Sequence, residues 1–168
     1  MPEVVSPLPA TQELFERYGA MVYRRCAAIL GGDELARDAV QEVFLRVIER
    51  RHQFRGESSP STWLYAVATL HCLQQLRDRT SRHAKLVQLA DEPQLTPSRG
   101  PESQLALVRL LDGEPDEVRL MVYLHYVDGM TMDEVANAVG YSRKTVSRRV
   151  NGFIATARAQ LAVEGGLP

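Results

Sequence analysis

The chain has 168 residues, of which 45% are hydrophobic and 24% charged, and its formal net charge is −1. This composition is typical of a folded protein and excludes a disordered one. No stretch reaches the roughly 18 uninterrupted apolar residues of a membrane-spanning helix, so we expect no membrane insertion. Residues 1–10 carry three prolines and no Lys or Arg, unlike a secretion signal, which predicts a cytoplasmic location.

Cys26 and Cys72 both lie within apolar helical patterns. They are predicted to be small buried side chains, with neither a disulfide nor a metal role. The four histidines lack the paired spacing of a zinc site. We therefore expect no metal and no cofactor.

Apolar residues recur every three or four positions over most of the chain, which predicts an all-α fold. A first helix ends at Gly31 and Gly32. A second should bury Ile48, and its outward or flanking residues are expected to be Asp38, Gln41, Glu42, Leu45 and Arg46. The apolar stripe of the first comprises Leu14, Tyr18, Met21, Val22, Cys26 and Ile29, and that of the second comprises Ala36, Val40, Val43, Phe44, Val47 and Ile48.

A third helix is expected from Ser59, its cap, to about Arg79, with Trp63 as a core anchor. Beyond it periodicity fails and prolines accumulate, which indicates a flexible linker between two small helical domains. The predicted organisation is a disordered tail over 1–10, a first domain over 11–80, a linker over 81–103, a second domain over 104–163 and a tail over 164–168.

The second domain contains a helix-turn-helix pattern. Thr131 and Glu134 have the spacing of a capping box, in which each side chain satisfies the other residue's backbone N–H. Gly140 suits the left-handed turn that follows this helix, and Ser142 caps the next one. Two helices joined by such a turn predict that the second enters the major groove of DNA.

The apolar face of this second helix is formed by Val146, Val150, Phe153, Ala157 and Leu161. Lys144, Arg148 and Asn151 lie nearly opposite and have the donors that read guanine and adenine edges. Arg143 and Arg149 flank that face and suit phosphates. The alternative, a solvated basic helix within a bundle, is less consistent with the absence of acids from 142 to 158.

Three segments, in order, resemble the extracytoplasmic-function (ECF) group of bacterial sigma factors. Residues 37–46 (RDAVQEVFLR) resemble the family's Asp-x-x-Gln-Glu-x-Phe motif. Residues 54–68, with FRGES followed by STWLYAVA, resemble its next region, and residues 126–158 resemble its helix-turn-helix region. The resemblance extends from about Leu14 to Leu161.

The resemblance implies a promoter-specificity factor that binds core RNA polymerase, through its β′ clamp helices and β flap, and binds double-stranded and melted promoter DNA. An anti-sigma factor is a possible further partner. Polymerase binding is assigned by resemblance to Asp38, Gln41 and Glu42. Reading of the −35 element is assigned to Arg143, Lys144, Ser147, Arg148, Arg149 and Asn151. Contacts with the −10 element are assigned to Leu70, His71, Gln74, Arg77 and Arg79.

The sequence departs from the family pattern within this last group. Leu70 stands where the family usually has Asn, and Gln74 where it usually has Asp. Leu70 cannot exchange a hydrogen bond with a captured base. Promoter melting is therefore the step at which we expect this chain to differ.

Two other functions were weighed against this one. A helix-turn-helix repressor would bind a palindromic operator without polymerase. An enzyme with an added DNA-binding module is disfavoured, because the sequence has no nucleophile and base pair, phosphate loop or paired carboxylates on one face. We therefore expect a protein that is not an enzyme.

Overall fold

The computed structural model describes residues 8–89 and 107–164, and all regular structure in these ranges is helical. The chain divides into two compact units, residues 1–113 and 114–168. The fold class predicted from the sequence is confirmed. No helix in the described ranges is long and apolar enough to span a membrane.

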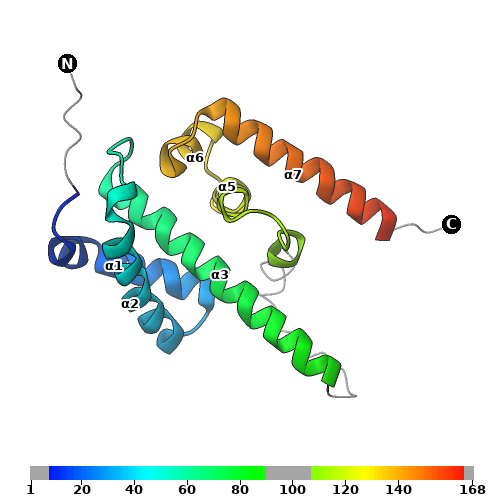
Figure 1. Ribbon diagram of the computed structural model, residues 1–168, viewed down its shortest axis with the longest axis horizontal. Helices are drawn as coiled ribbons and strands as arrows, with labels where there is room; N and C mark the ends of the chain where they lie inside the picture. Colours follow the sequence, from blue (N-terminus) through cyan, green and yellow to red (C-terminus); the bar gives the residue numbers. More distant parts are fainter. Residues whose placement is uncertain (1–7, 90–106, 165–168) are drawn as a thin grey trace. The chain divides into compact units, whose positions relative to one another are not determined.

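The first unit is built on three helices, α1 (Thr11–Leu30), α2 (Asp33–Arg50) and α3 (Pro60–Leu89), with a short 3-10 turn (Arg51–Gln53) after α2. All three pack against one another (Figure 1). Gly31 ends α1 in a left-handed conformation, with φ of 74°, which a residue without a Cβ adopts without strain. The core between the helices includes Leu14, Val22, Cys26, Ala36, Val43, Val47, Leu64 and Ala68.

Cys26 and Cys72 are both fully buried, as predicted. Cys26 lies on α1 and Cys72 on α3, and their thiols are hydrogen-bonded to each other. The hydrogen bond with Cys26, together with burial, raises the pKa of the Cys72 thiol. The same hydrogen bond lowers the pKa of Cys26, but both sulfurs are buried and neither is exposed to solvent.

Two expectations for this unit were wrong, those for Ile48 and for the end of α3, and the expectation for Trp63 holds in part. Ile48, predicted to be buried, is 55% exposed. Trp63 is half-buried, and its ring packs edge-on against Phe54 at a centroid distance of 5.5 Å. α3 does not end near Arg79 but continues to Leu89, past α1 and α2 in Figure 1, so the first part of the predicted linker is helical. The rest of that linker lies outside the described residues.

The second unit contains α5 (Asp116–Tyr126), α6 (Met132–Val139) and α7 (Arg143–Glu164), each packed against the other two. Its core draws on Val118, Met121, Val122 and Leu124 of α5, Val135 and Ala136 of α6, and Val146, Val150, Phe153 and Ala157 of α7. The apolar face predicted for α7 is confirmed except at Leu161, which is 51% exposed.

Candidate nucleic-acid interface

The helix-turn-helix forms through the local signals seen in the sequence. Thr131 Oγ1 accepts a hydrogen bond from the Glu134 backbone N–H at 3.2 Å, and the Thr131 N–H donates to Glu134 Oε2 at 2.7 Å. The bond from the Thr131 N–H, together with one that the Thr131 hydroxyl donates to the same oxygen at 3.0 Å, lowers the pKa of the Glu134 carboxyl. Gly140 then takes a left-handed conformation with φ of 73°. Both predicted features are confirmed.

Ser142 begins α7 by accepting a hydrogen bond from the Thr145 backbone N–H at 3.2 Å. Val146 and Val150 are completely buried. Lys144, Arg148 and Asn151 are exposed on the side away from this core. The N-terminal half of α7 therefore presents a basic and amide surface to solvent.

The two flanking arginines differ. Arg143 lies 3.4 Å from Asp133 in an ion pair whose side chains are both 68% exposed, and such a pair is weak enough to exchange for a phosphate. Arg149 instead donates to Glu117 Oε2 at 2.6 Å, with its guanidinium over the Tyr141 ring. Among the residues assigned to DNA on α7, Arg149 is thus held by the protein itself.

The residues assigned to the −10 element do not share one surface. Leu70, Gln74 and Arg77 are partly exposed and Arg79 is exposed. His71 is only 1% exposed, so the assignment of His71 to a DNA contact is wrong. Its position three residues after Ala68 and seven after Leu64, both buried, places it on the inner face of α3.

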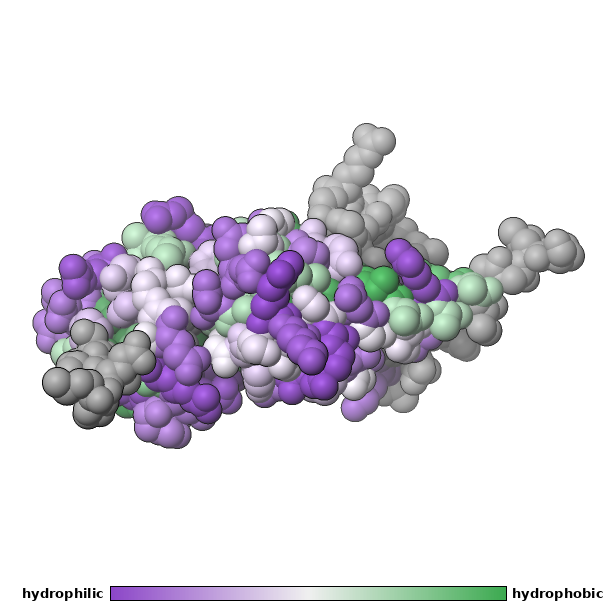
Figure 2. Space-filling model, turned by 90° about the horizontal axis from the view of Figure 1, so that it is seen from above, coloured by the Kyte–Doolittle hydropathy of each residue, from purple (hydrophilic) through white to green (hydrophobic). Residues whose placement is uncertain are grey.

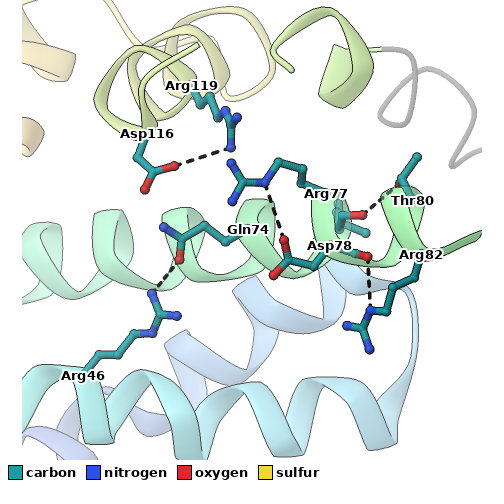
Figure 3. Close-up of polar contacts among 9 residues, drawn as sticks. Arg46, Gln74, Arg77, Asp78, Thr80, Arg82, Asp116 and Arg119 are labelled. Atoms are coloured by element: carbon teal, nitrogen blue, oxygen red, sulfur yellow. Dashed lines mark hydrogen bonds and ion pairs between the residues drawn. The ribbon is translucent and has the colours of Figure 1, made fainter. Parts of the chain in front are cut away.

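Gln74 and Arg77 also have partners within the first unit. The Gln74 side-chain oxygen accepts a hydrogen bond from Arg46 of α2 at 2.6 Å. Arg77 lies 3.6 Å from the carboxylate of its neighbour Asp78, and both contacts are drawn in Figure 3. A DNA contact by either side chain would compete with these interactions.

The residues assigned to polymerase lie on the outer side of α2. Asp38, Gln41 and Glu42 are all exposed. Leu45, expected to lie outward, is 59% exposed on the same face, and the sequence analysis missed that Ile48, 55% exposed, belongs there too. Helical spacing provided the signal, because positions 38, 41, 45 and 48 follow one another at intervals of three and four.

Most of the surface visible in Figure 2 is hydrophilic or of intermediate hydropathy. Two exposed apolar side chains beside charged and amide groups on one helix are typical of a protein interface. In the second unit, Tyr126, the last residue of α5, and Val127 after it are similarly exposed. Among the described residues, no group of three or more His, Cys, Asp or Glu could hold a metal ion.

These features define a helical protein with a helix-turn-helix unit. Comparison with known proteins shows which class of helix-turn-helix protein the chain resembles. Residues 14–82 match the model of sigma-70 region 2. The chain is 24% identical to the ECF RNA polymerase sigma factor SigW of Bacillus subtilis, covering 90% of this chain and 89% of SigW. It is 28% identical to SigM of Mycobacterium tuberculosis, covering 91% and 76%.

Residues 14–82 therefore match a sigma-70 region 2 domain, and the similarity over most of the chain supports an ECF sigma factor of the sigma-70 family. Among solved structures, it is similar to the sigma factor RpoE in complex with the anti-sigma factor NepR from Bartonella quintana, at 18% identity and a TM-score of 0.45. That match covers 90% of this chain and 96% of RpoE.

Proposed function

We propose that this sigma factor binds core RNA polymerase through the outer face of α2 and directs it to promoters whose −35 element is read by α7. The observation that carries the proposal is the separation of two faces on α7. Val146 and Val150 hold the helix on its unit, while Lys144, Arg148 and Asn151 remain exposed with the donors that base edges require.

The polymerase part of the proposal rests on α2. Asp38 and Gln41 lie beside Leu45 and Ile48, a combination of polar groups and exposed apolar surface that suits a protein partner better than DNA. We assign the β′ clamp helices to this face and the β flap to the second unit, following the family. An anti-sigma factor stays a predicted further partner.

The −10 part of the proposal rests on α3. Arg79 is exposed, and Leu70, Gln74 and Arg77 are partly exposed on the same helix. Melted DNA needs cations for its phosphates and a pocket for an unstacked base. In this proposal the chain catalyses no reaction, and polymerase supplies the chemistry.

The experiment is a pull-down of the chain with core polymerase, followed by transcription from a library of promoters with randomised −35 and −10 elements. Transcripts that require both the chain and core polymerase, and that share sequence at both elements, support the proposal. Tight binding to a palindromic duplex, without core binding or transcription, would instead establish the repressor.

A further inference from the structure

Three polar contacts join the helix assigned to polymerase with the helix assigned to melted DNA. Glu42 Oε2 lies 3.2 Å from His71 Nε2, and the Gln75 side-chain amide donates to the same oxygen at 3.4 Å. Arg46, one turn after Glu42, donates to Gln74 at 2.6 Å. Figure 3 shows Arg46 reaching from α2 to Gln74 on α3. We refer to these five residues as the α2–α3 polar bridge.

His71 is the unusual member of this bridge. Its ring is buried, and despite its closeness to Glu42 neither ring nitrogen makes a hydrogen bond of acceptable geometry with a described residue. Burial, reinforced by the positive charge of Arg46 and opposed by Glu42, lowers the pKa of His71 and favours the neutral ring. A buried polar group left in this state is costly, and an apolar residue there would stabilise the fold.

Glu42 connects this buried ring to the surface. Both of its contacts with α3 use Oε2, while its side chain is 54% exposed. A polymerase group that binds the carboxylate from outside therefore acts on the same side chain that contacts His71 and Gln75. Because His71 is shielded from water, a water molecule cannot take the place of Glu42 if that contact is lost.

We propose that Glu42 and Arg46 are positioning residues, which couple the docking of polymerase on α2 to the placement of residues 71–75 of α3 for promoter melting. This inference rests on the proposed function. Coupling between two sites is commonly a factor of about 5 to 150 in affinity. Loss of the bridge should therefore reduce melting without reducing the affinity for core polymerase by a similar factor.

The first test uses holoenzyme reconstituted with Arg46→Met, which keeps much of the aliphatic stem but removes the donor to Gln74. Open complexes are measured on a duplex promoter selected from the library and on the same promoter with its −10 element already unpaired. We expect core affinity within about twofold of wild type, at least about fivefold fewer open complexes on the duplex, and a loss of less than about twofold on the unpaired template.

Arg50→Met is the matched control, because Arg50 is an exposed cation of α2 outside the bridge. It should change none of these quantities. Arg46→Met and Gln74→Met both remove the same Arg46–Gln74 hydrogen bond. The double variant should therefore form no fewer open complexes than the more impaired single variant. If Arg46→Met does not fold, Arg46→Gln, which stays polar but lacks the guanidinium donor, provides the comparison with the same templates.

The second test separates positioning from simple stability. His71→Leu removes the buried ring nitrogens at similar side-chain volume, so we expect a higher melting temperature together with fewer open complexes on the duplex promoter. If His71 had only a structural role, a substitution that raises the melting temperature would not lower the number of open complexes.

The inference would be overturned if Arg46→Met lost equally on duplex and unpaired templates, or if the effects of Arg46→Met and Gln74→Met were additive. It would also be overturned if His71→Leu formed as many open complexes on the duplex promoter as wild type. A parallel loss of core affinity in Arg46→Met would also overturn it. Failure of the wild-type chain to bind core or support transcription would instead refute the proposed function, so the two failures are distinguishable.

Discussion

Arg149 of α7 and Glu117 of α5 are joined by an ion pair of 2.6 Å. Tyr141, in the turn before α7, donates its hydroxyl to the other Glu117 oxygen at 2.6 Å, and the Arg149 guanidinium lies over the Tyr141 ring. One carboxylate thus links α5 to the turn before α7 and to α7 itself. Arg149 therefore acts mainly in orienting α7.

This arrangement predicts opposite phenotypes for two neighbouring arginines. Arg149→Met should lower the free energy of unfolding by about 1 kcal/mol. It should also weaken binding to cognate and scrambled −35 duplexes by the same factor. Arg148→Met should leave stability within about 0.5 kcal/mol and cost roughly 1 to 3 kcal/mol at one preferred base. Denaturant unfolding and duplex binding at fixed salt measure both. Selective loss of cognate binding in Arg149→Met would place Arg149 on a base instead.

The same carboxylate predicts a pH dependence. The Tyr141 hydroxyl, followed by Arg149, holds the pKa of Glu117 below its ordinary value of 4.5. Because the pKa is lower in the folded state, the stabilisation is complete above about pH 4.5 and is lost as the pH falls through the folded value. Glu117→Gln keeps an acceptor for Tyr141 but removes the charge.

We therefore expect the stability advantage of the wild type over Glu117→Gln to be largest near neutral pH and to shrink below about pH 4.5. Urea unfolding of both proteins from pH 7 to pH 3 gives this difference directly, and acid effects common to both proteins cancel. A difference that stays constant over the whole range would show that the charge of Glu117 contributes nothing.

Features set by neighbours in sequence were predictable. The capping box at Thr131, the left-handed Gly140 and the apolar face of α7 depend on residues within a turn or two, and the structure confirms them. Contacts between distant residues were not predictable. Arg149 pairs with a residue 32 positions earlier, and His71 is buried because α1 and α2 cover its face of α3.

The end of α3 was misplaced for a different reason. Loss of apolar periodicity after Arg79 was interpreted as a linker, but no Gly or Pro occurs between residues 80 and 89. A polar segment without a helix breaker can extend a helix that packing has already nucleated. Ile48 was misassigned because a stripe of apolar residues does not reveal which edge the neighbouring helices leave uncovered.

The capping box provides a prediction about the stability of the second unit. Thr131→Ala removes the hydroxyl that accepts from the Glu134 backbone N–H and should cost about 1 kcal/mol of stability. Thr131→Ser keeps the acceptor and should stay within about 0.5 kcal/mol of wild type. Both can be compared by thermal unfolding. If alanine and serine lower stability equally, the hydroxyl bond does not stabilise α6.

The α2 face predicts a defect confined to polymerase binding. Asp38→Lys reverses an exposed charge away from the core, so helical content should be retained while core affinity falls by more than about 1 kcal/mol, or roughly fivefold. Glu16→Lys, an equally drastic charge change at an exposed position of α1, serves as the control. Competition with wild type for limiting core polymerase measures the effect. Equal competition by Asp38→Lys would remove this face from the interface.

Leu70 is the position where the chain departs most clearly from its family, and it is partly exposed on α3 four residues before Gln74. If a promoter base is captured beside an apolar Leu70, one of its polar edges lacks a partner, which costs on the order of 1 to 3 kcal/mol. We expect Leu70→Asn to increase transcription from promoters preferred by typical family members, with little gain on this protein's own promoters.

Asparagine at this position also removes apolar surface near Val67, which is itself partly exposed, so thermal unfolding of Leu70→Asn must first show a folded protein. Transcription by wild type and variant is then compared over a library randomised only in the −10 element. Leu70→Gln provides the same donor and acceptor one methylene further out, and it should shift the preference less, because the amide reaches a different depth. Identical −10 preferences for wild type and Leu70→Asn would show that position 70 lies outside the base-binding surface.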